Sequence, residues 1–95
     1  MEISYKLPFR KFVKKQRRPF QLLIEDEVEK IADNLDIGEL KTGDLRGFRV
    51  HKFSYLAQKF LIAYRLQENR VVFFTVSPHE NFYRELKKYL KEARK

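Results

Sequence analysis

Several residue types are absent or scarce in this chain of 95 residues, and each absence excludes a class of site. There is no cysteine, which excludes disulfides and thiolate metal sites. The three glycines, Gly38, Gly43 and Gly47, match neither the P-loop nor the dinucleotide fingerprint. The two histidines have no paired carboxylates or cysteines near them in the sequence. We therefore expect neither a metal nor a cofactor.

The chain also lacks a long hydrophobic run. No stretch approaches the roughly 20 apolar residues that span a bilayer, and the opening MEISYK has no secretory apolar segment. We expect a cytoplasmic protein that does not associate with membranes. What is abundant is hydrophobic and aromatic content, at 43% with nine Phe and five Tyr, far above the content of a disordered chain. We expect residues 1–95 to form one domain around a single core.

Charge is unevenly distributed along the chain, whose net charge at pH 7 is +8. Residues 25–44 hold eight acidic and two basic side chains, a net charge of −6, so the remaining residues carry +14. A basic body beside an acidic segment indicates a surface that faces a polyanion, and nucleic acid is the commonest such partner. The alternative is that the lysines serve solubility alone.

The first 35 residues predict a strand followed by two helices. Apolar and polar residues alternate over residues 2–7, which is typical of a strand. Pro8 can open a helix, because its missing N–H is not needed there. Over residues 20–35 apolar side chains recur at spacings of three and four, which predicts a helix of about four turns with an acidic outer face. The two helices are expected to form a hairpin that lies on a sheet.

The second half predicts three strands. After a loop over residues 36–47, alternation predicts strands over residues 48–51 and 59–66. Glu68-Asn69 is expected at a hairpin tip, and residues 71–76 are apolar on both faces, as in a central strand. The fold class is therefore α+β, with an N-terminal strand and helical hairpin packed on a small antiparallel sheet.

A helix is expected to close the fold. Ser77 and Glu80 fit a capping box, and Pro78 fits the first helical position. His79, Tyr83 and Lys87 follow at a spacing of four, so they share one face of this helix. The last residues, 91–95, are expected to be frayed and solvated.

Strand parity predicts which side chains share a face, because successive side chains of a strand point to opposite faces. The side chains expected to point to the helical hairpin are those of Phe48, Val50, Phe60, Ile62 and Tyr64. Those expected on the opposite face are Arg49, His51, Lys59 and Arg65. The closing helix begins where the fourth strand ends, which should bring His79 and Tyr83 to that second face.

Two imidazoles and a phenol among cations suit cleavage of RNA without a metal. A base removes the 2′-hydroxyl proton, cations stabilise the charged phosphorane, and an acid protonates the departing 5′-oxygen. A flat aromatic ring can also stack on an unstacked base. The candidates for catalysis are His79, Tyr83, His51 and Arg49. The candidates for binding RNA phosphates are Lys59, Arg65, Lys52, Arg46 and Lys87. The plainer interpretation of each is a solvated polar residue or, for Tyr83, an aromatic at the edge of the core.

Three short motifs resemble the RelE/ParE superfamily of bacterial toxins. Leu45-Arg46-Gly47 looks like the L-x-G turn before the second strand of that superfamily. Residues 60–64, FLIAY, are similar to a strand that ends in an aromatic, and residues 76–83, VSPHENFY, are similar to the histidine-plus-aromatic ending of YafQ-like members. With the strand and helical hairpin over residues 3–35, the resemblance covers nearly the whole chain.

The resemblance implies a RelE-like α+β fold and a neutralising antitoxin as partner. In the RNase branch, the toxin enters the ribosomal A site and cuts the mRNA there without a metal. By position, His79 matches the catalytic histidine of the YafQ-like ending and Tyr83 the aromatic four residues on, whereas Arg49 and His51 match the catalytic strand approximately. RelE-type members carry an arginine where this chain has Leu61, which leaves the basic side chains at positions 59 and 65 as substitutes.

Three functions stay open at this point. The leading hypothesis is a ribosome-dependent, metal-independent mRNA endonuclease of a type II toxin–antitoxin system. The second is a ParE-like inhibitor of DNA gyrase that cleaves nothing, and the third is a non-toxic basic RNA-binding module. The presence of both His79 and Tyr83 favours the nuclease, because binding to gyrase does not require an acid–base pair.

Overall fold

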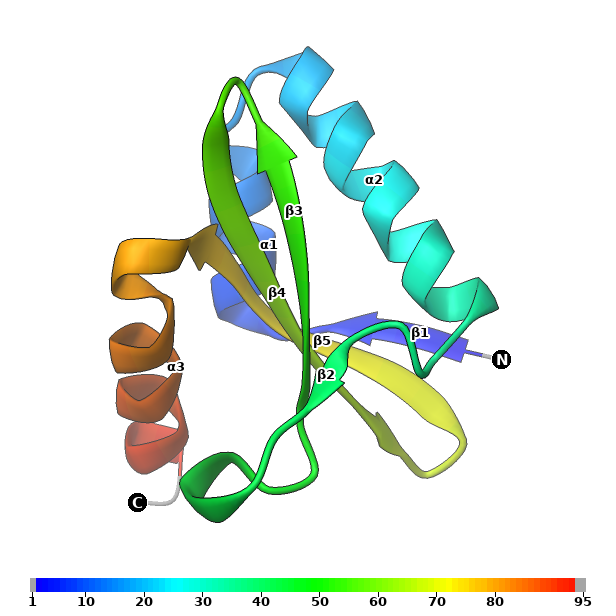
Figure 1. The fold of residues 1–95 in the computed structure, drawn as a ribbon, viewed down its shortest axis with the longest axis vertical. Helices are drawn as coiled ribbons and strands as arrows, with labels where there is room; N and C mark the ends of the chain where they lie inside the picture. The colour runs from blue at the N-terminus through cyan, green and yellow to red at the C-terminus, as the bar shows by residue number, and fades with distance from the viewer. Residues whose placement is uncertain (1, 94–95) are drawn as a thin grey trace.

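The structure, a computed structural model, describes residues 2–93 and shows three α-helices around one five-stranded sheet (Figure 1). The chain begins with β1 (Glu2–Tyr5), α1 (Leu7–Lys14) and α2 (Arg18–Asp33). It continues with β2 (Glu39–Leu40), a 3₁₀ turn (Gly43–Leu45), β3 (Arg49–Tyr55), β4 (Gln58–Gln67), β5 (Arg70–Pro78) and α3 (His79–Ala93). None of the helices within residues 2–93 is long and apolar enough to cross a membrane.

The sheet order is β1-β5-β4-β3-β2, and the predicted α+β class is confirmed. β5, β4, β3 and β2 are antiparallel neighbours, whereas β1 runs parallel to β5. The sheet is thus mixed, because the helical hairpin carries the chain away from β1 before the antiparallel strands begin. The short β2 lies within the stretch that the sequence predicted to be a loop.

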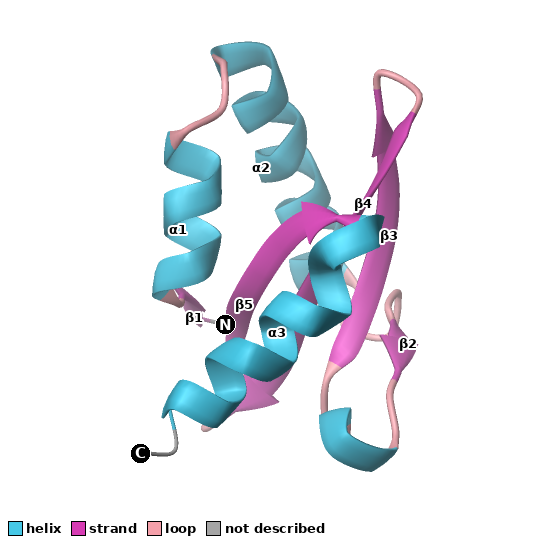
Figure 2. Cartoon of the chain, turned by 90° about the vertical axis from the view of Figure 1, so that its left-hand side faces the viewer, coloured by secondary structure: helices cyan, strands magenta, loops and turns pink. Residues whose placement is uncertain are grey.

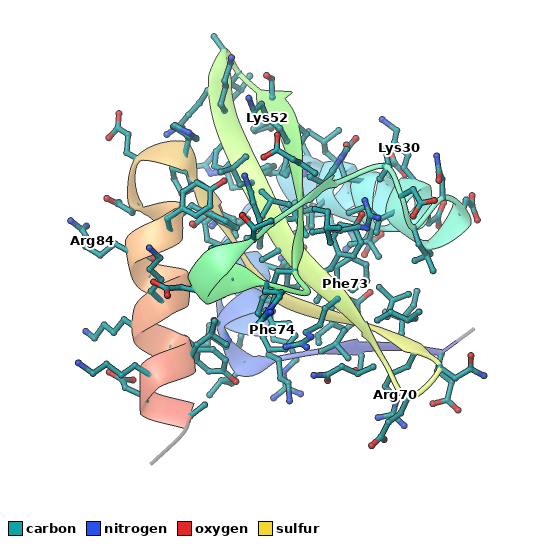
Figure 3. The ribbon with its side chains drawn as sticks, turned by 60° about the horizontal axis from the view of Figure 1, so that its bottom comes forward. Lys30, Lys52, Arg70, Phe73, Phe74 and Arg84 are labelled. Carbon is teal, nitrogen blue, oxygen red and sulfur yellow. The ribbon has the colours of Figure 1, made fainter. Side chains whose placement is uncertain are left out.

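Helices cover both faces of the sheet (Figures 1 and 2). The helical hairpin of α1 and α2 packs on one face, and α3 packs on the other. Phe73 and Phe74, neighbours on β5, belong one to each of the two hydrophobic clusters, and both are labelled in Figure 3. Burying one side chain of this size contributes about 1.5–3 kcal/mol. The hairpin on the sheet is confirmed, and the elements enclose two clusters rather than one core.

The predicted facing of β3 is wrong. Val50 and Phe48, just before the strand, lie in the α3 cluster, whereas Phe60, Ile62 and Tyr64 of β4 face the helical hairpin as expected. The pairing of His51 with Ile62 puts His51 on the hairpin face too, because residues directly opposite each other share a face. The cause is the two-residue turn at Leu56-Ala57, which fixes the register of β3 against β4.

The predicted capping box is also wrong. β5 continues through Ser77 to Pro78, and α3 begins one residue later than expected, at His79. Ser77 pairs with Leu61 of β4, and its hydroxyl is buried with no hydrogen-bond partner among the described residues. Ser77 is therefore part of the sheet and does not cap the helix. At the other end α3 includes residues 91–93, which contradicts fraying there, and the expectation for residues 94–95 lies outside the described residues.

Candidate functional site

A pocket of about 550 Å³ opens between the start of α3 and the free edge of β3. It brings together four of the predicted site residues, His51, Lys52, His79 and Tyr83. The other residues that line it are Ile37, Glu39, Lys41, Val50 and Leu61. Two imidazoles, a phenol and two ammonium groups therefore share one surface hollow.

The short β2 explains why the pocket is open. β2 pairs only with Arg49 and Val50, so within residues 2–93 the edge of β3 from His51 onward has no neighbouring strand. α3 begins directly where β5 ends, which places His79 at the helix start and Tyr83 one turn later on the same face. Two strands, β2 and β3, the loop after β2 and the helix α3 thus position the polar groups.

Lys41 is a site residue that the sequence analysis missed. Its ammonium group pairs with the Glu39 carboxylate and lies 5.3 Å from the centre of the Tyr83 ring. Glu39 raises the pKa of Lys41, so the ammonium stays charged beside the aromatic face. In the sequence, Lys41 is one of two basic residues within the acidic segment 25–44, and this was the signal that could have identified it.

The His51 side chain lies on the hairpin face of the sheet and not on the face that the sequence predicted. Its Nε2 lies 2.7 Å from Oε1 of Glu27 on α2, and only 11% of the His51 side chain is exposed. Glu27 was also missed, although it falls within the apolar stripe of α2 beside Ile24, Val28 and Ile31. A carboxylate in that stripe must find a polar partner, and this was the signal that could have identified it.

Arg49 does not line the pocket. Its guanidinium donates to the carbonyl oxygen of Gly38 at 2.8 Å and pairs with Asp36 at 3.2 Å. The buried Tyr64 hydroxyl donates to the carbonyl oxygen of Leu35 and accepts from the Gly38 N–H, at 2.8 and 2.9 Å. Both residues therefore hold the loop that leads into β2 against the sheet.

The other predicted phosphate-binding residues are spread over the surface. Lys59 is exposed near the β3–β4 turn. It lies on the same face as Lys52, because it pairs with Ser54.

Arg65 stacks its guanidinium over Phe48 at 4.9 Å, at the far end of β4. Arg46 is exposed before β3, and Lys87 lies 3.9 Å from Asp44. Of the predicted phosphate-binding set, Lys52 alone lines the pocket.

Within residues 2–93, no group of three His, Cys, Asp or Glu side chains is arranged to hold a metal ion. The chemistry that the pocket offers is proton transfer by imidazole or phenol and electrostatic stabilisation by ammonium groups.

Comparison with known proteins gives the family. The family described as the ParE-like toxin of type II bacterial toxin-antitoxin system matches residues 3–87. No curated protein matches the chain at a significant level. Among solved structures, the isolated E. coli RelE toxin is similar with a TM-score of 0.62 and 12% identity, over 94% of this chain and 97% of that one.

Two further structures share the fold at equally low identity. YafQ from E. coli has a TM-score of 0.57 and 14% identity, over 86% of this chain and 97% of that one. The RelBE2 toxin-antitoxin complex from Mycobacterium tuberculosis gives 0.56 and 16%, over 82% and 90%. The resemblance noted from the three motifs is thus confirmed, and the chain belongs to the ParE-like toxins of type II bacterial toxin–antitoxin systems, within the RelE/ParE superfamily.

Proposed function

We propose that this toxin is a ribosome-dependent mRNA endonuclease that works without a metal, and that the pocket between α3 and β3 is its active site. The observation that supports the proposal is the convergence of His51, His79, Tyr83, Lys41 and Lys52 on one hollow. These are the group types that cleavage through the 2′-hydroxyl needs, namely a base, an acid and cations.

His79 serves as the base in this proposal. It removes the 2′-hydroxyl proton, the 2′-oxygen attacks phosphorus, and the bond from phosphorus to the 5′-oxygen breaks. The second imidazole, His51, protonates the departing 5′-oxygen, so the products are a 2′,3′-cyclic phosphate and a 5′-hydroxyl. Proton transfer by a positioned side chain typically contributes about 10²–10⁴-fold.

Lys52 and Lys41 stabilise the negative charge that develops on the phosphoryl oxygens. Lys52 lies directly across from Leu61, the position where RelE-type members carry an arginine. A cation on the neighbouring strand can therefore replace the arginine that β4 lacks. In this proposal Lys52, and not Lys59 or Arg65, is the substitute for that arginine. Arg49 is assigned instead to holding the loop that carries Glu39 and Lys41.

The partners in this proposal are mRNA on the ribosome, in the cytoplasm, and a cognate antitoxin. Type II systems pair a toxin with an antitoxin, and the RelBE2 structure is, by its name, such a complex. The net charge of +14 outside residues 25–44 favours an antitoxin segment that presents acidic and apolar side chains. Such segments commonly become ordered on binding.

The decisive experiment is cleavage of ribosome-bound mRNA by purified variants. We expect His79→Ala to lower the cleavage rate by about 10²-fold or more, the usual scale for a general acid–base group. The matched control is Arg84→Ala, because Arg84 is exposed and points away from the sheet on the same helix (Figure 3). A folded His79→Ala protein with full cleavage and full toxicity would contradict the site.

Variants of Tyr83 test how the pocket holds a nucleobase of the RNA. Lys41 lies over the Tyr83 ring, and if stacking on a base is what the ring provides, Tyr83→Phe should retain more activity than Tyr83→Ala in the same assay. Base–aromatic stacking is worth about 1–3 kcal/mol per base by alanine substitution, a loss of about 5-fold to 150-fold. Equal losses in the two variants would instead assign the hydroxyl as a proton donor.

A second candidate function is inhibition of DNA gyrase without cleavage, which is favoured by the match to a family named after ParE. Expression in cells separates it from the nuclease. Rapid translation arrest with mRNA cut inside codons supports the nuclease, whereas a DNA damage response with intact mRNA supports the gyrase inhibitor. Absence of any growth effect supports the third hypothesis, a non-toxic RNA-binding module.

A further inference from the structure

Glu27 and His51 form a buried link between α2 and the pocket. Oε1 of Glu27 lies 2.7 Å from Nε2 of His51, and its other oxygen, Oε2, accepts from Nζ of Lys30 at 2.8 Å. The Glu27 side chain is only 6% exposed, so it is withdrawn from water on an otherwise apolar helix stripe. Withdrawal of a carboxylate from water is costly unless each oxygen has a partner, and here each has one.

The bond fixes which nitrogen of the imidazole is used. Burial raises the pKa of the Glu27 carboxyl, but the hydrogen bonds from Lys30 and His51 outweigh it, so the pKa is lowered overall and the group is an anion at neutral pH. An ionised carboxylate only accepts hydrogen bonds, so Nε2 of His51 must carry a proton. Nδ1 is then the ring nitrogen left for any other partner.

We propose that Glu27 is a positioning residue for RNA cleavage: it holds the His51 ring through Nε2–H, so that in the doubly protonated ring Nδ1–H gives its proton to the departing 5′-oxygen and leaves the neutral Nε2–H tautomer. This inference rests on the proposed nuclease function. His51 is one of the residues that line the pocket with His79 and Tyr83, and its Nε2 is tied to α2 on the hairpin face of the sheet. A carboxylate behind an imidazole sets both its orientation and its tautomer, and at metal-bound imidazoles loss of such a partner costs about 10–100-fold.

The kinetic test uses Glu27→Gln, which keeps the shape of the side chain and removes its charge. We expect a fall in kcat of about tenfold or more with KM nearly unchanged, because Glu27 does not contact RNA itself. The shorter carboxylate of Glu27→Asp should restore part of the rate. Glu29→Gln is the matched control, because Glu29 is an exposed carboxylate on the same helix and the change removes the same charge.

A double-variant cycle separates positioning from general loss of stability. In a His51→Ala background, Glu27→Gln should cause no further fall in kcat, because a residue that acts only through His51 has nothing left to hold. Thermal melts establish that each variant is folded. A full additional loss in the double variant, or a folded Glu27→Gln protein with the wild-type kcat, would overturn the proposal.

A second measurement does not depend on the nuclease function. Nitrogen-15 NMR of the free protein should show His51 protonated at Nε2 throughout the neutral range, and this preference should weaken in Glu27→Gln. A neutral ring protonated at Nδ1 would overturn the proposal even if the protein cleaves mRNA. Conversely, failure of the wild-type protein to cleave, with the Nε2–H tautomer intact, would reject the nuclease function and leave the geometry of the pair standing.

Discussion

At the scale of single residues, Glu27 shows how a buried carboxylate stays charged. Burial raises the pKa of the Glu27 carboxyl. The hydrogen bonds from Lys30 and His51 outweigh burial and lower the pKa below the ordinary carboxyl value. A carboxyl whose pKa is lower in the folded than in the unfolded chain stabilises the fold above its ordinary pKa. That contribution is lost as the pH falls through the folded-state value.

This sign gives a measurable prediction for Glu27→Gln, whose side chain cannot titrate. The free energy of unfolding of the wild type should exceed that of the variant near pH 6, and the difference should shrink as the pH falls below about 4. Urea denaturation of both proteins at steps of pH measures it, and the other carboxyl groups cancel in the difference. A gap that stays constant from pH 6 to pH 3 would mean that Glu27 is not stabilised as an anion.

At the scale of elements, the segment between α2 and β2 carries site residues and is held by side chains from the sheet. Tyr64 and Arg49 bind its backbone at Leu35 and Gly38. A Cβ atom at Gly38 would lie 2.7 Å from the Tyr64 hydroxyl oxygen and 2.8 Å from a ring carbon, closer than side chains tolerate. The same segment then delivers Glu39 and Lys41 to the pocket.

We therefore expect Gly38→Ala to destabilise the protein by about 1–3 kcal/mol, the usual cost of overpacking a well-filled site. Cleavage should fall as well, because the shifted segment moves Lys41 away from Tyr83. Thermal melts and the ribosome assay measure the two effects, and Thr42→Ala, an exposed position later in the same segment, is the control. An unchanged melting temperature would show that the segment can yield without cost.

The elements also show what the sequence could predict. Periodicity gave the helices and the apolar strand β5, and Glu68-Asn69 does form a turn with positive φ at both residues. Leu56-Ala57 adopts the same kind of turn without glycine, asparagine or aspartate, so no local signal marked it. That turn sets the register of β3, and this is why the predicted face of His51 was wrong.

Site residues were predictable where chemistry and helix spacing coincide. His79 and Tyr83 were identified because a helix start and a spacing of four place them together, and both line the pocket. Glu27 and Lys41 are distant in sequence from His51 and Tyr83, and only the fold brings each pair into contact. Ser77 failed as a cap because pairing with β4 overrode its local preference.

At the scale of the whole molecule, the acidic and basic residues are arranged so that part of the charge is cancelled internally. Glu27, Asp36 and Glu39, all from the acidic segment, pair with cations of α2, β3 and the loop. Lys52 and Lys59 stay exposed on the face of the sheet beside the pocket. These two cations are therefore available to a polyanion at the place where catalysis is proposed.

This arrangement predicts that affinity for the ribosome falls steeply with salt, because each ammonium that meets a phosphate releases a counterion. Replacement of Lys52 with Gln should make the log–log slope of affinity against salt shallower by about 0.7, the value for one contact on a single strand. Arg70→Gln is the charge-matched control, since Arg70 lies at the opposite end of the molecule and pairs with Glu2 (Figure 3). Binding measured between about 50 and 200 mM salt tests both variants. A wild-type affinity that does not change with salt would contradict the proposed polyanion-binding surface. Equal changes in the two variants would show that net charge, and not the face beside the pocket, attracts the RNA.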